Sequence, residues 1–152
     1  MEIRGHLYDE IIKKNGEKQL IDQGHNMIVN KCHELVAKLI KGEIKYGESD
    51  PEFYFLVGSS DETPVPSDTG MHNESMRKRI EGVSLTNNTI TFSVTFGADE
   101  GNDTTDNKNQ WKECGILAII GGNDFLLNRK VTNNVIIKDD TFAITRTFKI
   151  TF

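Results

Sequence analysis

The sequence is poor in the residues that build disulfide scaffolds, zinc sites and membrane segments. Of its 152 residues only Cys32 and Cys114 are cysteines, and neither has a second Cys or His at zinc-ligand spacing. We expect two ordinary buried thiols. No apolar run approaches the roughly 18 residues of a membrane span, and residues 1–6 lack the apolar stretch of a secretory signal. These absences predict a soluble protein without an export signal.

An excess of positive charge is also missing. The chain has 18 Lys and Arg residues against 23 Asp and Glu residues, which gives a net charge of −5. Proteins that bind nucleic acid or anionic lipid without sequence specificity use an excess of cations to displace counterions. We therefore expect neither nucleic acid nor a membrane as a partner.

Catalytic motifs are absent as well. The sequence contains no phosphate-binding glycine loop, nucleophile elbow or metalloprotease helix, and its histidines stand singly at His6, His25, His33 and His72. No carboxylate pair stands out as a glycosidase site. The acidic stretch 99–106 lacks the register of a calcium-binding loop and is expected to be solvated; its cation binding stays open. We predict a non-enzymatic protein with no catalytic residue, no cofactor and no metal ligand.

Alternating apolar and polar residues dominate what the sequence does contain. Residues 142–152 place large apolar groups at every second position, which predicts a strand with one buried face. Residues 84–96 contain a second alternation around Asn87 and Asn88 and predict a hairpin. Further strands are expected at 3–11, 19–22, 52–57, 78–83, 111–120, 125–131 and 135–138. Short turns such as those at 15–16, 121–124, 133–134 and 139–140 join them.

These strands predict a single domain, 1–152, of a mainly β fold: an antiparallel β-sandwich or a flattened barrel. One segment differs, because residues 28–41 repeat their apolar groups at helical spacing. We expect an amphipathic helix near the N-terminus, capped by Asn26 or Asn30 and ended by Gly42. It should cover a sheet edge or an open end of the core.

Two charged residues interrupt apolar strand faces. Arg146 points inward in the alternation of 142–152, and an unpaired buried charge would cost several kcal/mol. Glu113 lies among apolar residues beside Gly115, a position typical of a strand bulge. We predict a structural ion pair between Arg146 and Glu113, with Glu74 as the next partner to test. The basic clusters 77–79 and 129–130 should be solvated or paired with Glu74, Glu81 and Glu113.

Two long segments lack apolar periodicity, 58–70 and 97–110. Loops of this length are uncommon unless they bind something or are disordered. We therefore predict that both loops face a partner. The residues expected to make these contacts are Asp61, Pro64, Pro66, Asp99, Glu100, Asp103 and Asp106.

Several short segments form a pattern through their order along residues 24–152. They are 24–30 (GHNMIVN), 53–60 (FYFLVGSS), 73–77 (NESMR), 89–96, 111–117 (WKECGIL), 126–131 (LLNRKV), 137–138 and the closing strand 142–152. In this order they resemble the small structural proteins of tailed-bacteriophage tails and baseplates.

The resemblance implies a non-enzymatic virion component of the tail, baseplate or tail fibre, assembled in the host cytoplasm. Its partners would be copies of itself and neighbouring tail or fibre proteins, and the terminal strand 142–152 could extend a neighbour's sheet. Two alternatives stay open. One is a head-decoration protein of the same viruses. The other is a carbohydrate-binding β-sandwich that contacts a host-surface glycan through Trp111 or Tyr54.

Overall fold

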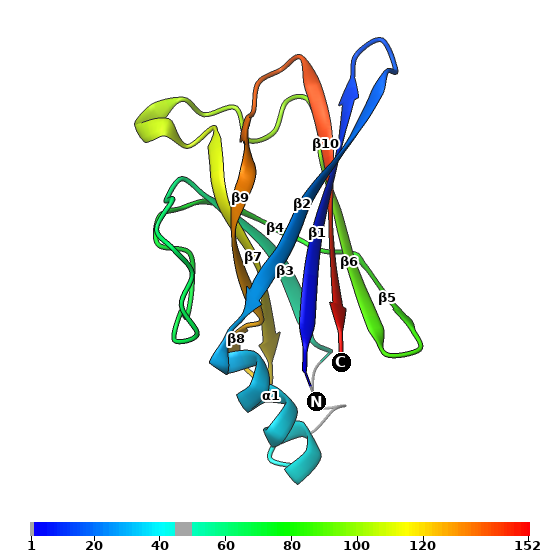
Figure 1. Ribbon diagram of the computed structural model, residues 1–152, viewed down its shortest axis with the longest axis vertical. Helices are drawn as coiled ribbons and strands as arrows, with labels where there is room; N and C mark the ends of the chain where they lie inside the picture. Colours follow the sequence, from blue (N-terminus) through cyan, green and yellow to red (C-terminus); the bar gives the residue numbers. More distant parts are fainter. Residues whose placement is uncertain (1, 45–49) are drawn as a thin grey trace.

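The computed structural model describes residues 2–44 and 50–152 (Figure 1). Within them the chain forms one α-helix, α1 (Asn30–Lys41), one short 3₁₀ turn, η1 (Thr105–Asn107), and ten strands. The strands are β1 (Arg4–Lys13), β2 (Lys18–Ile28), β3 (Glu52–Gly58), β4 (Glu74–Arg79), β5 (Gly82–Thr86), β6 (Thr89–Phe96), β7 (Gln110–Ile120), β8 (Asn123–Leu126), β9 (Asn128–Ile137) and β10 (Phe142–Thr151).

All described strand pairs are antiparallel and form one curled sheet in the order β4-β3-β7-β9-β2-β1-β10-β6-β5, with β8 paired to β7. The link between β9 and β2 is short, with Met27 opposite Arg129 and Ile28 opposite Asn128. This link divides the sheet into a first half-sheet (β2, β1, β10, β6 and β5) and a second half-sheet (β4, β3, β7, β9 and β8). The mainly β, sandwich-like fold expected from the sequence is confirmed.

The two half-sheets face each other across the core. The Phe55 ring of β3 stacks on Phe148 of β10 at 5.3 Å between centroids, and Phe96 of β6 meets Trp111 of β7 at 4.9 Å. All four rings are buried. Apolar residues at alternate positions of both half-sheets thus close the core, as the alternation in the sequence requires.

The helix lies at one end of the sheet (Figure 1). It buries Cys32 and Leu35 against the core, and Gly42 ends it in the left-handed conformation (φ 77°). Two expectations are wrong. Two long strands precede the helix, so it is not near the N-terminus, and its N-cap is Val29, which makes no side-chain hydrogen bond. The β-ladder with β9 continues to Ile28, so the chain is still extended where helical spacing begins.

Three predicted boundaries are also wrong. Segment 78–83 is broken at Ile80, whose N–H donates to Phe53 O (2.8 Å) as the chain crosses from the second half-sheet to the first. Segment 125–131 is broken at Leu127, between β8 and β9. The expected turn at Asn133 and Asn134 lies inside β9.

Strand β10 lies between β1 and β6. Its backbone hydrogen-bonding groups are paired on both sides. The terminal strand therefore has no free edge with which to extend a neighbour's sheet, contrary to expectation.

Candidate functional site

Arg146 is buried against a carboxylate, as expected, but the carboxylate is Asp9. Arg146 Nε lies 2.9 Å from Asp9 Oδ1, and both side chains are fully buried. The β1–β10 register places these residues directly opposite each other, whereas Glu113 lies in the other half-sheet. The guanidinium also stacks on Trp111, 5.1 Å from the ring centroid. The predicted pair between Arg146 and Glu113 is therefore wrong.

Glu113 pairs instead with Arg129, a member of one of the two basic clusters. Arg129 Nη2 lies 2.8 Å from Glu113 Oε2, and neither side chain is exposed. The second cluster contains a similar but exposed pair, in which Arg77 Nε donates to Glu74 Oε2 (2.8 Å). The expectation that these arginines pair with Glu113 and Glu74 is confirmed.

The ion pair of Glu113 and Arg129 holds a surface loop. Glu113 accepts the backbone N–H groups of His72 (3.0 Å) and Asn73 (2.7 Å). Arg129 donates to the carbonyl of Glu62 (2.9 Å) and pairs with Asp68 Oδ2 at 3.3 Å. We call residues 59–73 the clamped loop, and Glu113, Arg129 and Asp68 the clamp.

Two glycines allow the clamp to close. A Cβ at Gly58 would lie 2.4 Å from Glu113 Oε1 and 2.5 Å from Asn73 O, and a Cβ at Gly115 would lie 2.4 Å from Asn128 O. The backbone therefore approaches the buried carboxylate at Gly58, and the backbone of β9 at Gly115, more closely than any other residue would permit. A strand irregularity is present beside Glu113, but the register of β7 against β9 shifts between Trp111 and Glu113 rather than at Gly115.

His72 connects the buried clamp to solvent. Its Nε2 lies 2.8 Å from Asp68 Oδ1, and its Nδ1 contacts Glu62 Oε2. These hydrogen bonds, that of Asp68 foremost, raise the pKa of His72 above its usual 6.5. Burial opposes ionisation of Asp68, but bonds from His72 and Val65 N–H and the charge of Arg129 outweigh it and lower the pKa of Asp68.

The clamp leaves the outer part of the loop accessible. Asp61 and Pro66 are exposed and Pro64 is half-buried. Val65 between the prolines is 43% exposed, although its N–H donates to Asp68 Oδ2 (3.0 Å). Pro66 O accepts the Asn30 N–H at the start of α1 (2.8 Å). The loop is thus tied to the fold at several points and presents a Pro-Val-Pro tip to solvent.

The second predicted loop, 97–110, is held by side chains at its base, and its last residue, Gln110, already belongs to β7. Lys138, a fully buried residue, donates through Nζ to Asn102 Oδ1 (2.9 Å). Asp99, Asp103 and Asp106 are exposed as expected, but Glu100 is half-buried and binds Lys78 Nζ (2.6 Å). Glu100 is therefore less available to a partner than the sequence suggested.

The described residues contain no group of three or more His, Cys, Asp or Glu side chains placed to hold a metal ion. Burial raises the pKa of Cys32 to about 11 and that of Cys114 to about 12. The two thiols are buried and unpaired with each other, as expected.

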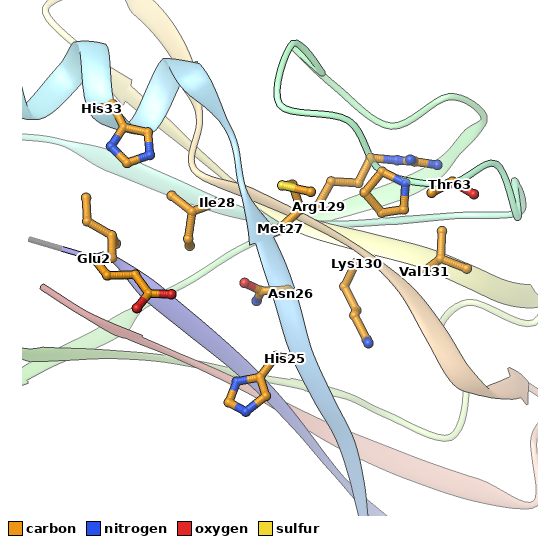
Figure 2. Close-up of a pocket in the computed structure, with 12 residues that line it drawn as sticks. Glu2, His25, Asn26, Met27, Ile28, His33, Thr63, Arg129, Lys130 and Val131 are labelled. Carbon is orange, nitrogen blue, oxygen red and sulfur yellow. The ribbon is translucent and has the colours of Figure 1, made fainter.

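A hollow of about 610 Å³ lies where β2 and β9 meet, beside the clamp (Figure 2). In Figure 2, Arg129, Thr63 and Lys130 lie toward one side of the hollow, His33 lies on the helix, and His25 lies on β2. Burial lowers the pKa of Lys130. The hollow is open, is lined by apolar as well as polar residues, and lies between the clamped loop and the start of the helix.

A second hollow lies on the outer face of the first half-sheet. His6 stacks on Tyr8 (centroids 4.4 Å apart) and meets His25 edge-on (4.6 Å), while Lys149 Nζ lies 5.8 Å from the Tyr8 centroid. Threonines of β6 and β10 complete the wall. Sequence reasoning missed this cluster, because its members come from three strands whose register was unknown.

The two aromatic residues proposed for glycan binding are less suitable. Trp111 is fully buried, and Tyr54 is half-buried with its hydroxyl donating to Glu52 Oε2 (3.1 Å). A sugar cannot stack on a ring enclosed by the core, so the prediction that Trp111 contacts a glycan is wrong.

The chain matches no protein-family model, and no curated protein or solved structure is significantly similar to it. No helix within residues 2–44 and 50–152 has the length and apolarity needed to cross a membrane.

Proposed function

We propose that the protein is a non-enzymatic structural component of a tailed-phage particle, in the tail, baseplate or fibre attachment. It would assemble in the host cytoplasm, remain in the virion, and act by contacts with its own copies and with neighbouring tail or fibre proteins. The clamped loop is the surface that we assign to a neighbour.

The convergence of the resembling segments on the clamp carries this proposal. Gly58 closes segment 53–60, Asn73 opens segment 73–77, Glu113 lies in 111–117 and Arg129 in 126–131. These residues, far apart in the chain, meet at the base of one loop. The segments that carry the resemblance to phage structural proteins thus also contain the residues that hold the clamped loop in place.

The chemistry of the clamp suits display of a loop better than catalysis. Glu113, Arg129 and Asp68 are paired with one another and with backbone groups of the loop. A loop ordered before binding loses less conformational entropy when its partner docks. Such a loop supports repeated, specific contacts in a particle.

The proposal is tested by locating the protein. Peptide mass spectrometry of particles purified from lysed source cells should detect the chain in a fixed ratio to the major particle proteins. Cryo-electron microscopy of the same particles should place it in the tail, with the clamped loop against a neighbour. Absence of the chain from washed particles would refute the proposal, and density on the capsid would favour a head-decoration protein.

Glycan binding is a second candidate, favoured by the His6, Tyr8 and His25 cluster. Stacked rings beside Lys149 and a row of hydroxyl groups offer both an apolar face and hydrogen-bond donors. A glycan array should then report binding that Tyr8→Ala removes. An array without signal would set this candidate aside.

A further inference from the structure

The two ends of the sheet differ in how they are protected. Strand β4 at one end of the strand order carries the charged residues Glu74, Arg77, Lys78 and Arg79, whereas β5 (GVSLT) at the other end carries no charge. Charged side chains on an edge strand prevent pairing with another chain, and an exposed apolar edge invites it. The sheet is therefore closed to association at β4 and open at β5.

Strand β5 is accessible along its whole length. All five of its residues are exposed, with Val83 at 39% and Leu85 at 69%. Figure 1 shows the β5–β6 hairpin at the margin of the molecule, away from β9 and the clamped loop. Val83 lies opposite Phe92 and Leu85 opposite Ile90, so both side chains lie on the core-facing side of the sheet, beyond the part that the core covers.

The free hydrogen-bonding groups of this edge belong to the same two residues. A two-residue turn joins Thr86 to Thr89, and such turns close on a hydrogen-bonded pair. Gly82, Ser84 and Thr86 therefore direct their backbone groups toward β6. Val83 and Leu85 direct theirs outward.

We propose that β5 pairs with β5 of a second copy of this chain, antiparallel and about a two-fold axis at Ser84. In that register Val83 lies opposite the partner's Leu85, twice, and each pair exchanges two backbone hydrogen bonds. Ser84 lies opposite its own symmetry mate, and no like charges meet. The edge is complementary to itself in side chains as well as in backbone.

The difference between the β4 and β5 edges also favours a two-fold dimer over a ring or filament. A ring or filament would need β5 of one copy to pair with a different surface of the next. The other terminal edge, β4, disfavours such pairing because four of its six residues are charged. The two-fold contact closes after two copies. Because it uses only five residues per chain, its buried area falls in the class of weak interfaces, and the dimer should depend on concentration.

This inference rests on the self-assembly part of the proposed function and names its contact. Sedimentation equilibrium of the full chain over a range of concentrations tests it. We expect a monomer–dimer equilibrium, and Leu85→Lys should weaken association at least about tenfold by placing a charged side chain opposite the partner's Val83 in both pairs. Leu20→Lys is the matched control: Leu20 is 71% exposed but lies on β2, and the variant should dimerise like the wild type.

A cross-linking variant tests the register. Ser84 would form a non-hydrogen-bonded pair across the axis, in which side chains approach closely enough for a disulfide. Since Cys32 and Cys114 are buried, Ser84→Cys supplies an accessible thiol and should form a covalent dimer under mild oxidation. Ser93→Cys on the inner strand β6, another exposed serine, should form much less.

A wild-type chain that stays monomeric at every concentration would overturn the β5 dimer, as would association that Leu85→Lys leaves unchanged. Detection of the chain in purified particles does not depend on either result. A failure of this inference is therefore distinguishable from a failure of the proposed function.

Discussion

Two arginines, Arg129 and Arg146, are completely buried, and they stabilise different parts of the structure. Arg146 joins two adjacent strands, β10 and β1, through Asp9, and its guanidinium stacks on Trp111 inside the core. Arg129 joins strand β9 to Glu113 of β7 and, beyond the sheet, to Asp68 and the carbonyl of Glu62 in the clamped loop.

The comparison separates two uses of a buried charge. Burying the guanidinium costs free energy at both sites. What the ion pair stabilises depends on whether the partner residue belongs to a strand or to a loop. Where both partners are strand residues, the pair specifies strand register. Where one partner is a loop, the pair orders a surface that apolar contacts alone would leave loosely held. Variants of each arginine should therefore fail differently.

The largest effect is expected for Arg146. Replacing it with Met leaves Asp9 buried without a counter-charge and should lower the free energy of unfolding by about 3–5 kcal/mol. Urea denaturation measures this change. Restoring charge balance by Asp9→Leu in the Arg146→Met background should recover most of it, because an apolar pair can replace a buried ion pair. Unchanged stability of the single variant would mean that Arg146 is not buried against a carboxylate.

A smaller and more local effect is expected for Arg129→Met. Glu113 keeps its two backbone N–H donors in this variant, so the loss should be about 1.5–3 kcal/mol, in the range of hydrogen bonds to charged groups. Hydrogen exchange should accelerate mainly in residues 59–73, and much less in β1 and β10. Arg79→Met, an exposed arginine, is the control. Equal acceleration throughout the sheet would contradict the division between the two arginines.

A substitution that pushes the clamp residues apart should have an effect similar to that of Arg129→Met on stability and on hydrogen exchange in the clamped loop. Gly58→Ala adds a methyl group at 2.4 Å from Glu113 Oε1 and should destabilise the protein by about 1–3 kcal/mol through overpacking. Gly82→Ala is a matched control on a strand, because its added Cβ would meet no atom within 4 Å. Exchange in residues 59–73 should increase for the first variant alone.

The sequence predicts where Arg146 lies but not its partner. Alternation in 142–152 places Arg146 inside the core, where a guanidinium needs a carboxylate or several carbonyl groups. The same signal was present at Asp9, an inward position between Leu7 and Ile11. Alternation does not predict that the first strand pairs with the last, because this contact joins residues that are 137 positions apart.

The clamp could be predicted only in part. A pairing of Arg129 with Glu113 was among the expectations, but no periodicity indicates where an aperiodic loop such as 59–73 will lie. Turn residues can also mislead: Asn133 and Asn134 interrupt no strand. They bridge the gap between β9 and β2, where Asn134 N–H donates to Gln23 Oε1 (3.0 Å) and Asn133 Nδ2 donates to Gln23 O (3.2 Å).

The smallest effect should come from a change of pH. Near neutrality, pH should change the stability of the clamped loop but not that of the core around Arg146. The pKa of His72 is raised in the folded protein by Asp68 and Glu62. Its contribution is therefore complete below the unfolded value of 6.5 and is lost as pH rises through the higher folded value. Asp68, whose pKa is lowered, loses its contribution on the acid side instead.

Limited proteolysis within residues 59–73 should thus be faster at about pH 8.5 than at about pH 6, after correction for protease activity on an unstructured peptide. His72→Gln retains hydrogen-bonding capacity without the titration and should remove the difference. The pair of Arg146 and Asp9 contains no histidine, so unfolding of the core should show no step that matches that of His72. A step of equal size in His72→Gln would assign the pH dependence to another group and leave the clamp without a role in it.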